Sequence, residues 1–363
     1  MIDRFNALAL RGNVKIEVWF SDLVSSSRSW DVDPATWHFS YRVLPKLRLP
    51  GTSLSWVLPA PMLTTPCDIV ISLYSEPAFI LGWMVARIRG KKTGFRVLKT
   101  FDRWTPRSRL RSAIKRFMFS RADAIETPGP DARQYAIDGG ARPDRIYYLP
   151  HTVDLAYLQS RSTHARQNRE ATRKALGLKG VVFLYVGRLW WGKGVDSLID
   201  AFSSFLRKTS RPTSLLIVGD GPPEEEARLH AKVVRSAPGR VIFAGFQQKQ
   251  NLPDWYALAD VFVFPTLGDP YGIVIEEAMA CSLPIISTDA AGDISARIKD
   301  GINGYIVPSE APAMLAAAMS SISRSDEFRQ SMGRAAAASV VNHTPEQWAM
   351  NFEDMTRKTL RWA

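Results

Sequence analysis

Cysteine is nearly absent from this sequence of 363 residues, which contains only Cys67 and Cys281. Two cysteines can form at most one disulfide, which excludes a small extracellular scaffold held together by disulfides. We therefore expect both to be reduced thiols in the core. Neither cysteine shares a zinc-ligand spacing with a histidine, so we predict no metal site.

Long hydrophobic runs are also missing. The longest, near residues 78–85, is far shorter than the ~20 apolar residues that span a bilayer. The first ten residues include Asp3, Arg4 and Asn6 and lack the apolar centre of a secretory signal. We expect a protein that is neither exported nor integral to a membrane, and that is located in the cytoplasm.

Acidic residues are scarce in one half of the chain. Residues 1–150 hold 23 Lys and Arg against 13 Asp and Glu, whereas the remainder holds 24 against 22. A basic amino-terminal half favours a polyanionic partner or an anionic membrane surface.

The overall composition, with 46% hydrophobic and 23% charged residues, is that of a globular protein. A chain of this length exceeds one hydrophobic core, so two domains are expected.

Short apolar runs alternate with helical patterns along the first half. We predict strands at residues 13–20, 67–73, 95–100, 124–127 and 146–149, and helices at 77–89, 108–121 and 130–139. Residues 159–174 are polar and basic without apolar periodicity, and we interpret them as a connection and the start of a helix. The boundary between the domains is then placed near residues 155–175.

The same alternation restarts in the second half. Strands are predicted at residues 181–186, 214–218, 240–243, 261–264, 284–287 and 305–307, and helices at 195–206, 224–234, 252–259 and 273–281. This order is typical of an α/β fold in which helices cover both faces of a parallel sheet. Ligands of such sheets bind where loops leave the carboxyl ends of the strands.

Two loops of the second half carry charges suited to such a ligand. Residues 187–194 (GRLWWGKG) contain Arg188 and Lys193, which together could grip a diphosphate. Solvated cations at a helix entry would explain them as well. Downstream, Asp269 precedes a helix in which Glu277 falls on the inward side, while Glu276 is expected to face solvent. Capping of that helix would also account for both acids.

Several segments of the second half together resemble one known family. The matching pieces are VGRLWWGKGVDSLIDAF, LLIVGDGP, VIFAGF, LPDWYALADVFVFPT, GDPYGIVIEEAMACSLPII and AGDISARIKDGINGYIVP. In order and spacing they are similar to the carboxyl-terminal domain of the retaining glycosyltransferases of family 4. That resemblance implies the GT-B fold, with two Rossmann-like domains facing a deep cleft between them. The family's E-x7-E motif stands here as D-x7-E, from Asp269 to Glu277.

The resemblance also implies roles for individual residues. Arg188 and Lys193 would bind the donor diphosphate, Asp269 the donor sugar hydroxyls, and Glu277 the ribose hydroxyls. The backbone around Gly272 and Ile273 would meet phosphate, and Phe246 would lie near the base. Gly187 is also implied for donor binding.

The amino-terminal half resembles the family less. LPHTVD (residues 149–154) replaces the interdomain piece P-N-G-V-D, with His151 in place of Asn. The family's opening strand and glycine-rich loop, ahead of a segment like RFNALALRG, are missing. No histidine stands in KTFDRW, where many relatives place one, which leaves Asp102, with His151, as a candidate for contacting the acceptor. The implied domains are 1–160 for the acceptor, 161–344 for the nucleotide sugar, and a helix over 345–363 that returns to the first domain.

The implied reaction is the metal-independent transfer of a sugar, with retention, from a UDP- or GDP-sugar to a hydroxyl of a glycan or lipid-linked acceptor. Cell-surface polysaccharide or glycolipid synthesis would be its setting, and no cofactor beyond the donor is required. Residues 87–121 hold 13 Lys and Arg and one acid, so peripheral attachment to the inner face of a membrane is a further option. A sugar-nucleotide epimerase or hydrolase stays open. So does a nucleic-acid-binding protein, which we do not expect because it leaves Asp269 and Glu277 unexplained.

Overall fold

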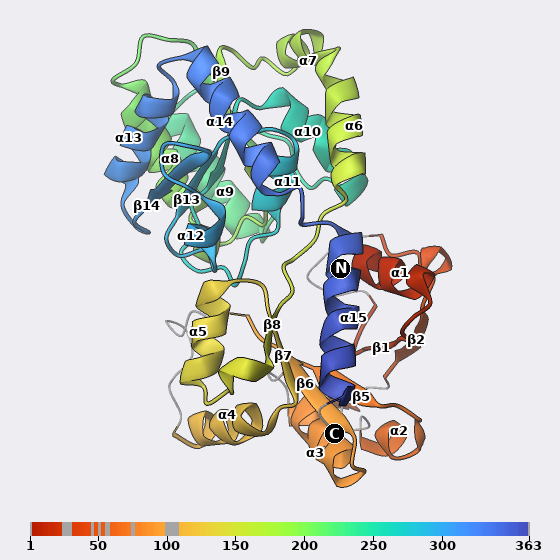
Figure 1. Ribbon diagram of the computed structural model, residues 1–363. Coiled ribbons are helices and arrows are strands. Elements are labelled where there is room, and N and C mark those ends of the chain that lie inside the picture. Colours follow the sequence, from red (N-terminus) through yellow and green to blue (C-terminus); the bar gives the residue numbers. More distant parts are fainter. Residues whose placement is uncertain are drawn as a thin grey trace. The chain divides into compact units, whose positions relative to one another are not determined.

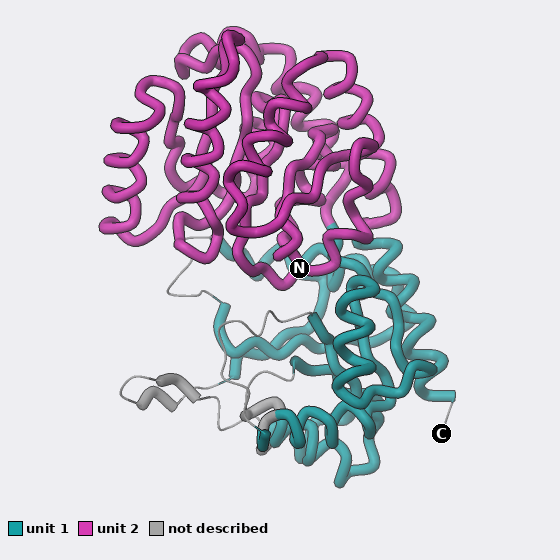
Figure 2. The backbone as a smooth tube through the Cα atoms, turned by 90° about the vertical axis from the view of Figure 1, so that its left-hand side faces the viewer, with its two compact units in different colours: residues 1–152, 344–363 teal, residues 153–343 magenta. Residues whose placement is uncertain are grey.

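The computed structural model describes residues 2–23, 31–44, 47–49, 52–54, 59–73, 77–98 and 109–361. Within it the chain forms two compact units (Figure 2). Unit 1 combines Met1–Thr152 with Thr344–Ala363, and unit 2 is Val153–His343. Each unit is described by itself below. Asp102, a candidate for contacting the acceptor, lies outside the described residues.

Unit 1 contains a parallel sheet of four strands in the order β5-β6-β7-β8 (Figure 1). Its strands are β5 (Ile69–Ser72), β6 (Lys92–Arg96), β7 (Ala124–Thr127) and β8 (Ile146–Tyr148). They alternate with helices α3 (Pro77–Ile88), α4 (Arg109–Arg121) and α5 (Pro130–Asp138), and a 3-10 turn, η3 (Pro143–Arg145), leads into β8. Trp83, Phe95 and Phe119 form the buried aromatic centre of its core. The strand-helix alternation predicted from the sequence is therefore present.

Unit 1 contains a second, smaller core. Helix α15 (Pro345–Arg361) packs against α1 (Ile2–Arg11), with Leu8, Trp348 and Met355 buried between them. An ion pair of 2.8 Å joins Arg11 to Glu353 on the same two helices. The other elements are the parallel pair β1 (Glu17–Phe20) and β2 (Ser40–Val43), the hairpin of β3 (Leu47–Leu49) and β4 (Thr52–Leu54), η1 (Pro34–Thr36) and α2 (Pro59–Thr64).

Unit 2 is built on a parallel sheet of six strands in the order β11-β10-β9-β12-β13-β14. The strands are β9 (Val181–Val186), β10 (Thr213–Val218), β11 (Val241–Phe243), β12 (Val261–Phe264), β13 (Ile285–Thr288) and β14 (Gly304–Val307). The chain runs outward from β9 to β11, returns beside β9 as β12, and then runs outward the other way. The junction of β9 and β12 is thus the point where the strand order reverses, which is where such sheets bind ligands.

Helices cover both faces of this sheet (Figure 1). Alternate residues of β9 enter different cores: Val182 and Leu184 belong to one, and Phe183 and Tyr185 to the other. The helices and 3-10 turns of unit 2 are α6 (Leu155–Arg166), α7 (Arg169–Ala175), η4 (Trp191–Lys193), α8 (Val195–Leu206), α9 (Pro223–Ser236), η5 (Lys249–Asn251), α10 (Leu252–Leu258), α11 (Val274–Ala280), α12 (Ile294–Arg297), α13 (Pro312–Ile322) and α14 (Asp326–Ser339).

The connection between the two sheets differs from its sequence-based prediction. Residues 159–174, interpreted as a link and the start of a helix, fall in α6, a turn of two residues and α7. The first unit ends at Thr152, just before the predicted boundary region of residues 155–175. Asp154 caps α6 by accepting from the Tyr157 backbone N–H at 2.9 Å. Arg161 on α6 pairs with Asp254 on α10 at 2.8 Å. Polar contacts of this kind, together with the buried Leu158, hold the segment to unit 2.

Candidate functional site

Two loops of unit 2 meet beyond the junction of β9 and β12. The Lys193 ammonium, from the loop after β9, forms an ion pair with the Asp269 carboxylate, from the loop after β12. The backbones are joined as well, because the Leu267 N–H donates to the Gly192 carbonyl at 3.0 Å. Two residues that the sequence placed 76 positions apart are thus brought into direct contact.

Gly194 allows this close approach. Its φ of +69° lies in the left-handed region, and a Cβ there would stand 1.9 Å from the Pro265 carbonyl oxygen. A larger residue would push the loop after β9 away from the loop after β12. The glycine therefore fixes Lys193 beside Asp269.

Arg188 lies exposed at the start of the same loop. The buried Tyr185 hydroxyl donates to the Arg188 carbonyl at 2.8 Å and so fixes the backbone of Arg188. Its guanidinium makes no hydrogen bond or ion pair with another described residue and lies 6.0 Å from the centre of the Trp190 ring. Arg188 therefore presents its donors to solvent, from the same loop as Lys193.

Asp269 is held firmly in its loop. One carboxylate oxygen accepts from the Tyr271 N–H at 2.8 Å, and the other faces Lys193. Its own N–H donates to the Ala290 carbonyl at 3.0 Å, and its carbonyl accepts from the Gly292 N–H at 2.8 Å. The carboxylate therefore has a fixed position at the carboxyl edge of the sheet.

Glu277 points inward, as predicted, and is 7% exposed. Its partner is Tyr256 of α10, whose buried hydroxyl donates to the carboxylate at 2.9 Å. Burial raises the pKa of Glu277, while the nearby Lys249 and the Tyr256 hydrogen bond lower it, and the net shift is upward. Sequence reasoning missed Tyr256 because nothing in the spacing of α10 marks it as a partner of α11.

The prediction that Glu276 faces solvent is wrong. The residue is 0% exposed and pairs at 3.0 Å with Arg297, which is itself buried on α12. Arg297 Nη2 donates to the carbonyls of Tyr271 and Gly292. Helix α11 is enclosed on all sides from Ile275 to Ala280, so a second acid could stay charged only with an internal cation.

A histidine lies beside this buried pair. His343 Nδ1 is 4.0 Å from the nearer Glu276 oxygen. Burial lowers the pKa of His343, Glu276 raises it, and Arg297 lowers it, so the neutral imidazole is favoured. Glu276, Arg297 and His343 therefore form an internal support beneath the loop that carries Asp269.

The remaining donor candidates are distributed around these loops. Gly187, Phe246, Gly272 and Ile273 are all partly buried in unit 2. Gly272 has a φ of +76° and lies where a Cβ would stand 2.7 Å from the Phe264 ring. Helix α11 begins one residue after Ile273 and has only seven residues. His151, predicted near the acceptor, is partly buried and belongs to unit 1.

Residues 180–325 match the family model described as glycosyl transferases group 1. A D-inositol 3-phosphate glycosyltransferase of Kribbella flavida is 29% identical over 208 residues, covering 54% of this chain and 47% of that protein. An alpha-D-kanosaminyltransferase of Streptomyces kanamyceticus is 29% identical over 244 residues, covering 67% and 59%. The chain thus spans about half the length of these curated relatives.

Solved structures share the fold across nearly the whole chain. The sucrose-phosphate synthase of Thermosynechococcus elongatus matches with a TM-score of 0.78 and 18% identity, covering 99% of this chain and 92% of that one. The HepE protein of Anabaena, solved in complex with UDP, matches with a TM-score of 0.72 and 17% identity, covering 88% and 87%. Both likenesses support two Rossmann-like units of the GT-B type. Residues 180–325 are thus similar to the glycosyl transferases group 1 family.

Proposed function

We propose that this protein transfers a sugar from a nucleoside diphosphate sugar to a hydroxyl group of a glycan or lipid-linked acceptor. The observation that carries the proposal is the ion pair of Lys193 and Asp269 at the point where the strand order of unit 2 reverses, with the exposed Arg188 in the same loop as Lys193. The cations Arg188 and Lys193 suit a diphosphate, and the acid Asp269 suits the hydroxyls of a sugar. The relatives named above are transferases, which favours transfer over the epimerase, hydrolase and nucleic-acid alternatives.

The donor lies across the loops after β9 and β12. Arg188, with its exposed donors, grips two diphosphate oxygens, and the Lys193 ammonium turns partly from Asp269 toward the phosphate beside the sugar. Asp269 then accepts from hydroxyls of the sugar. Glu277 accepts from the ribose hydroxyls, with Tyr256 holding the carboxylate in position. A complex of the structural neighbour HepE with UDP supports a uridine nucleotide as the first donor to examine.

The chemical step exchanges one bond at the anomeric carbon for another. The bond from that carbon to the diphosphate oxygen breaks, and the acceptor oxygen bonds to the carbon on the same face. The acceptor proton passes to the departing diphosphate. Negative charge develops on the leaving group, and Arg188 and Lys193 stabilise it without a metal ion. Retention of configuration follows from attack on the face from which the leaving group departs.

A thermal-shift panel of UDP- and GDP-sugars on the full-length protein, with EDTA present, tests the donor. We expect at least one to raise Tm, and Arg188→Ala to remove most of that rise. Arg235→Ala, at an exposed arginine on α9, is the matched control and should respond like the wild type. The proposal fails if no nucleotide sugar stabilises the protein while Arg188→Ala and Glu277→Gln remain folded.

We further propose that the enzyme rests on an anionic membrane surface through α4 of unit 1. This basic helix exposes 70% of Leu110 and 49% of Phe117, whereas Met118 is buried. Apolar side chains among arginines favour the headgroup region of an anionic bilayer. Sedimentation with phosphatidylglycerol vesicles should fall for Leu110→Ser/Phe117→Ser and at high salt. Equal binding by the variant would contradict this part of the proposal. No helix among the described residues is long and apolar enough to cross a bilayer.

A further inference from the structure

A hollow of unit 2 lies at the opposite edge of its sheet from the loops described above. It has a volume of about 620 Å³ and is lined where β9, β10, β12 and β13 begin, by Val181, Pro212, Asp260 and Pro284 among others. The candidate donor site lies at the ends of the strands. A ligand in this hollow would therefore be separated from the donor by the length of the strands.

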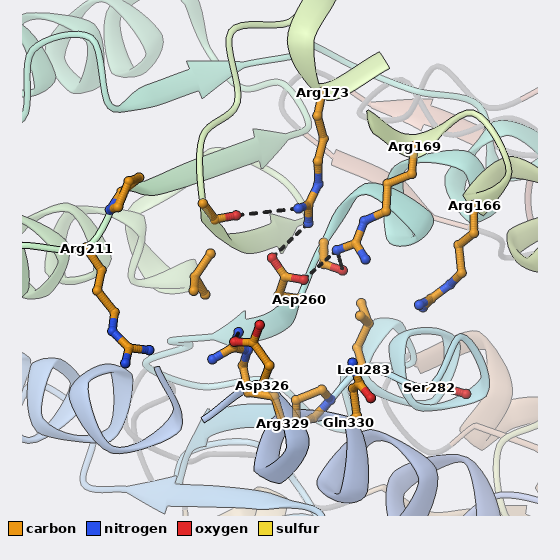
Figure 3. Close-up of a pocket in the computed structure, with 15 residues that line it drawn as sticks. Arg166, Arg169, Arg173, Arg211, Asp260, Ser282, Leu283, Asp326, Arg329 and Gln330 are labelled. Atoms are coloured by element: carbon orange, nitrogen blue, oxygen red, sulfur yellow. Dashed lines mark hydrogen bonds and ion pairs between the residues drawn. The ribbon is translucent and has the colours of Figure 1, made fainter. Parts of the chain in front are cut away.

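Five arginines line this hollow, which we call the arginine hollow. They come from three helices and a loop: Arg166, Arg169, Arg173, Arg211 and Arg329. Its lining contains only two carboxylates, Asp260 and Asp326. Figure 3 shows Arg166, Arg169 and Arg173 entering from one side and Arg211 from another. The lining therefore carries a formal excess of three positive charges.

Some of these arginines form ion pairs that hold the fold together. Asp260 lies between Arg169 and Arg173, with 2.8 Å to the latter, and accepts from the Val182 N–H at 2.8 Å. Asp326 pairs with Arg329. These pairs hold α7 to the start of β12 and stabilise the first turn of α14. Two carboxylates face three arginines in these pairs, so most of their charge is balanced within the protein.

The charges of Arg166 and Arg211 are not balanced by a carboxylate in this way. Arg166 donates to the Cys281 carbonyl at 2.7 Å, and Arg211 donates to the carbonyls of Ser323 and Arg324 at 2.9 and 3.1 Å. Among the described residues, neither makes an ion pair with a carboxylate. Burial and the neighbouring Arg169 lower the pKa of Arg166. The hollow thus keeps two arginines whose charge nothing inside it neutralises, although their orientation is fixed by carbonyl groups.

Uncompensated, pre-oriented guanidinium groups around a recess are the arrangement that recognises phosphate. The volume exceeds that of one phosphate and suits a small molecule that carries two. We propose that the arginine hollow binds a phosphate-bearing anion, with Arg166 and Arg211 supplying the decisive charges. This site is independent of the donor site and would bind its ligand whether or not the proposed transferase activity is correct.

Calorimetric titration of the full-length protein with inorganic pyrophosphate tests the proposal. The double variant Arg166→Gln/Arg211→Gln removes two positive charges without leaving an unpaired carboxylate. We expect wild type to bind one more pyrophosphate than the double variant, or at least tenfold more tightly. Pyrophosphate bound by Arg188 and Lys193 is common to both proteins and cancels in the comparison. Arg235→Gln, outside the hollow, should behave like the wild type.

A parallel titration with phosphatidylglycerol vesicles distinguishes a lipid headgroup from a soluble phosphate. Loss of pyrophosphate binding in the double variant indicates a soluble ligand, and loss confined to the vesicles indicates a headgroup. Either result supports an anion site. Should the double variant not fold, Arg166→Gln and Arg211→Gln singly must each weaken binding. The proposal is overturned if variants that fold match the wild type with both probes, or if Arg235→Gln loses as much.

Discussion

The contact between Lys193 and Asp269 has a consequence for the donor at the scale of single residues. A diphosphate must draw Lys193 partly away from a carboxylate that already neutralises it. Asp269 therefore opposes binding of the bare nucleotide while it supports binding of the sugar. The affinities for nucleotide and for nucleotide sugar should respond differently when its charge is removed.

Asp269→Asn provides the first prediction. The variant keeps an oxygen for the Tyr271 N–H, at 2.8 Å in the wild type, and releases Lys193. We expect a nucleoside diphosphate to bind as tightly as before or more tightly, while kcat/KM falls about a hundredfold. Calorimetry and a transfer assay measure the two quantities. A parallel fall in nucleotide affinity would show that Asp269 does not act on the sugar.

Glu277 is a buried carboxylate whose negative charge costs the folded protein stability. Its pKa is raised in the folded protein by burial. The folded state therefore holds a proton more tightly than the unfolded chain, and the contribution of Glu277 to stability decreases as pH rises through that raised pKa. Above it, the charge opposes folding.

Glu277→Gln should remove this pH dependence. Glutamine can still accept from the Tyr256 hydroxyl, so packing is preserved. We expect a higher Tm than wild type at pH 7, a difference that shrinks toward pH 4, and loss of transfer activity. Thermal scans across that range measure the effect. A variant less stable than the wild type at pH 7 would contradict the role given to burial.

At the scale of elements, the buried pair of Glu276 and Arg297 ties α11 to α12. Arg297 also donates to the carbonyls of Tyr271 and Gly292, so it supports the loop that contains Asp269. Removing the arginine leaves a wholly buried carboxylate without its cation. Removing the glutamate leaves Arg297 with its carbonyl partners.

We therefore predict an asymmetric result. Arg297→Met should cost about 3–5 kcal/mol of unfolding free energy, because an isolated buried charge is left behind. Glu276→Met should cost less, and the double variant should recover part of the loss of Arg297→Met. Urea denaturation followed by circular dichroism gives the three values. Additive costs would mean that the two residues act independently.

Gly194 offers a prediction about the loop after β9. Alanine there combines left-handed strain with the 1.9 Å approach of its Cβ to the Pro265 carbonyl. Gly177, with a φ of +72° and no atom within 4 Å of the position that a Cβ would take, isolates the strain alone. Gly177→Ala should cost about 1 kcal/mol. Gly194→Ala should cost more and also weaken nucleotide binding, which melting and calorimetry would reveal; equal costs would argue against the close approach.

At the scale of the whole molecule, the two units depend differently on the end of the chain. Unit 2 is continuous from Val153 to His343, whereas unit 1 includes α15 and buries Trp348, Phe352 and Met355 of that helix against Leu8. Deletion of residues 344–363 should therefore unfold or loosen unit 1 and leave unit 2 intact. Hydrogen exchange would show the loss of protection confined to residues 2–152. Protection lost equally in both units would contradict this division.

The sequence by itself determined the α/β alternation and the loops that carry Arg188, Lys193, Asp269 and Glu277. Those features are local, because apolar runs, turn residues and helical spacing act over a few positions. Only the tertiary structure decided the partners. Tyr256 reaches Glu277, Arg297 encloses Glu276, and Arg166 and Arg211 enter one hollow. Each of these contacts depends on the strand order β11-β10-β9-β12-β13-β14, which brings segments that are distant in the sequence close together and which no local pattern encodes.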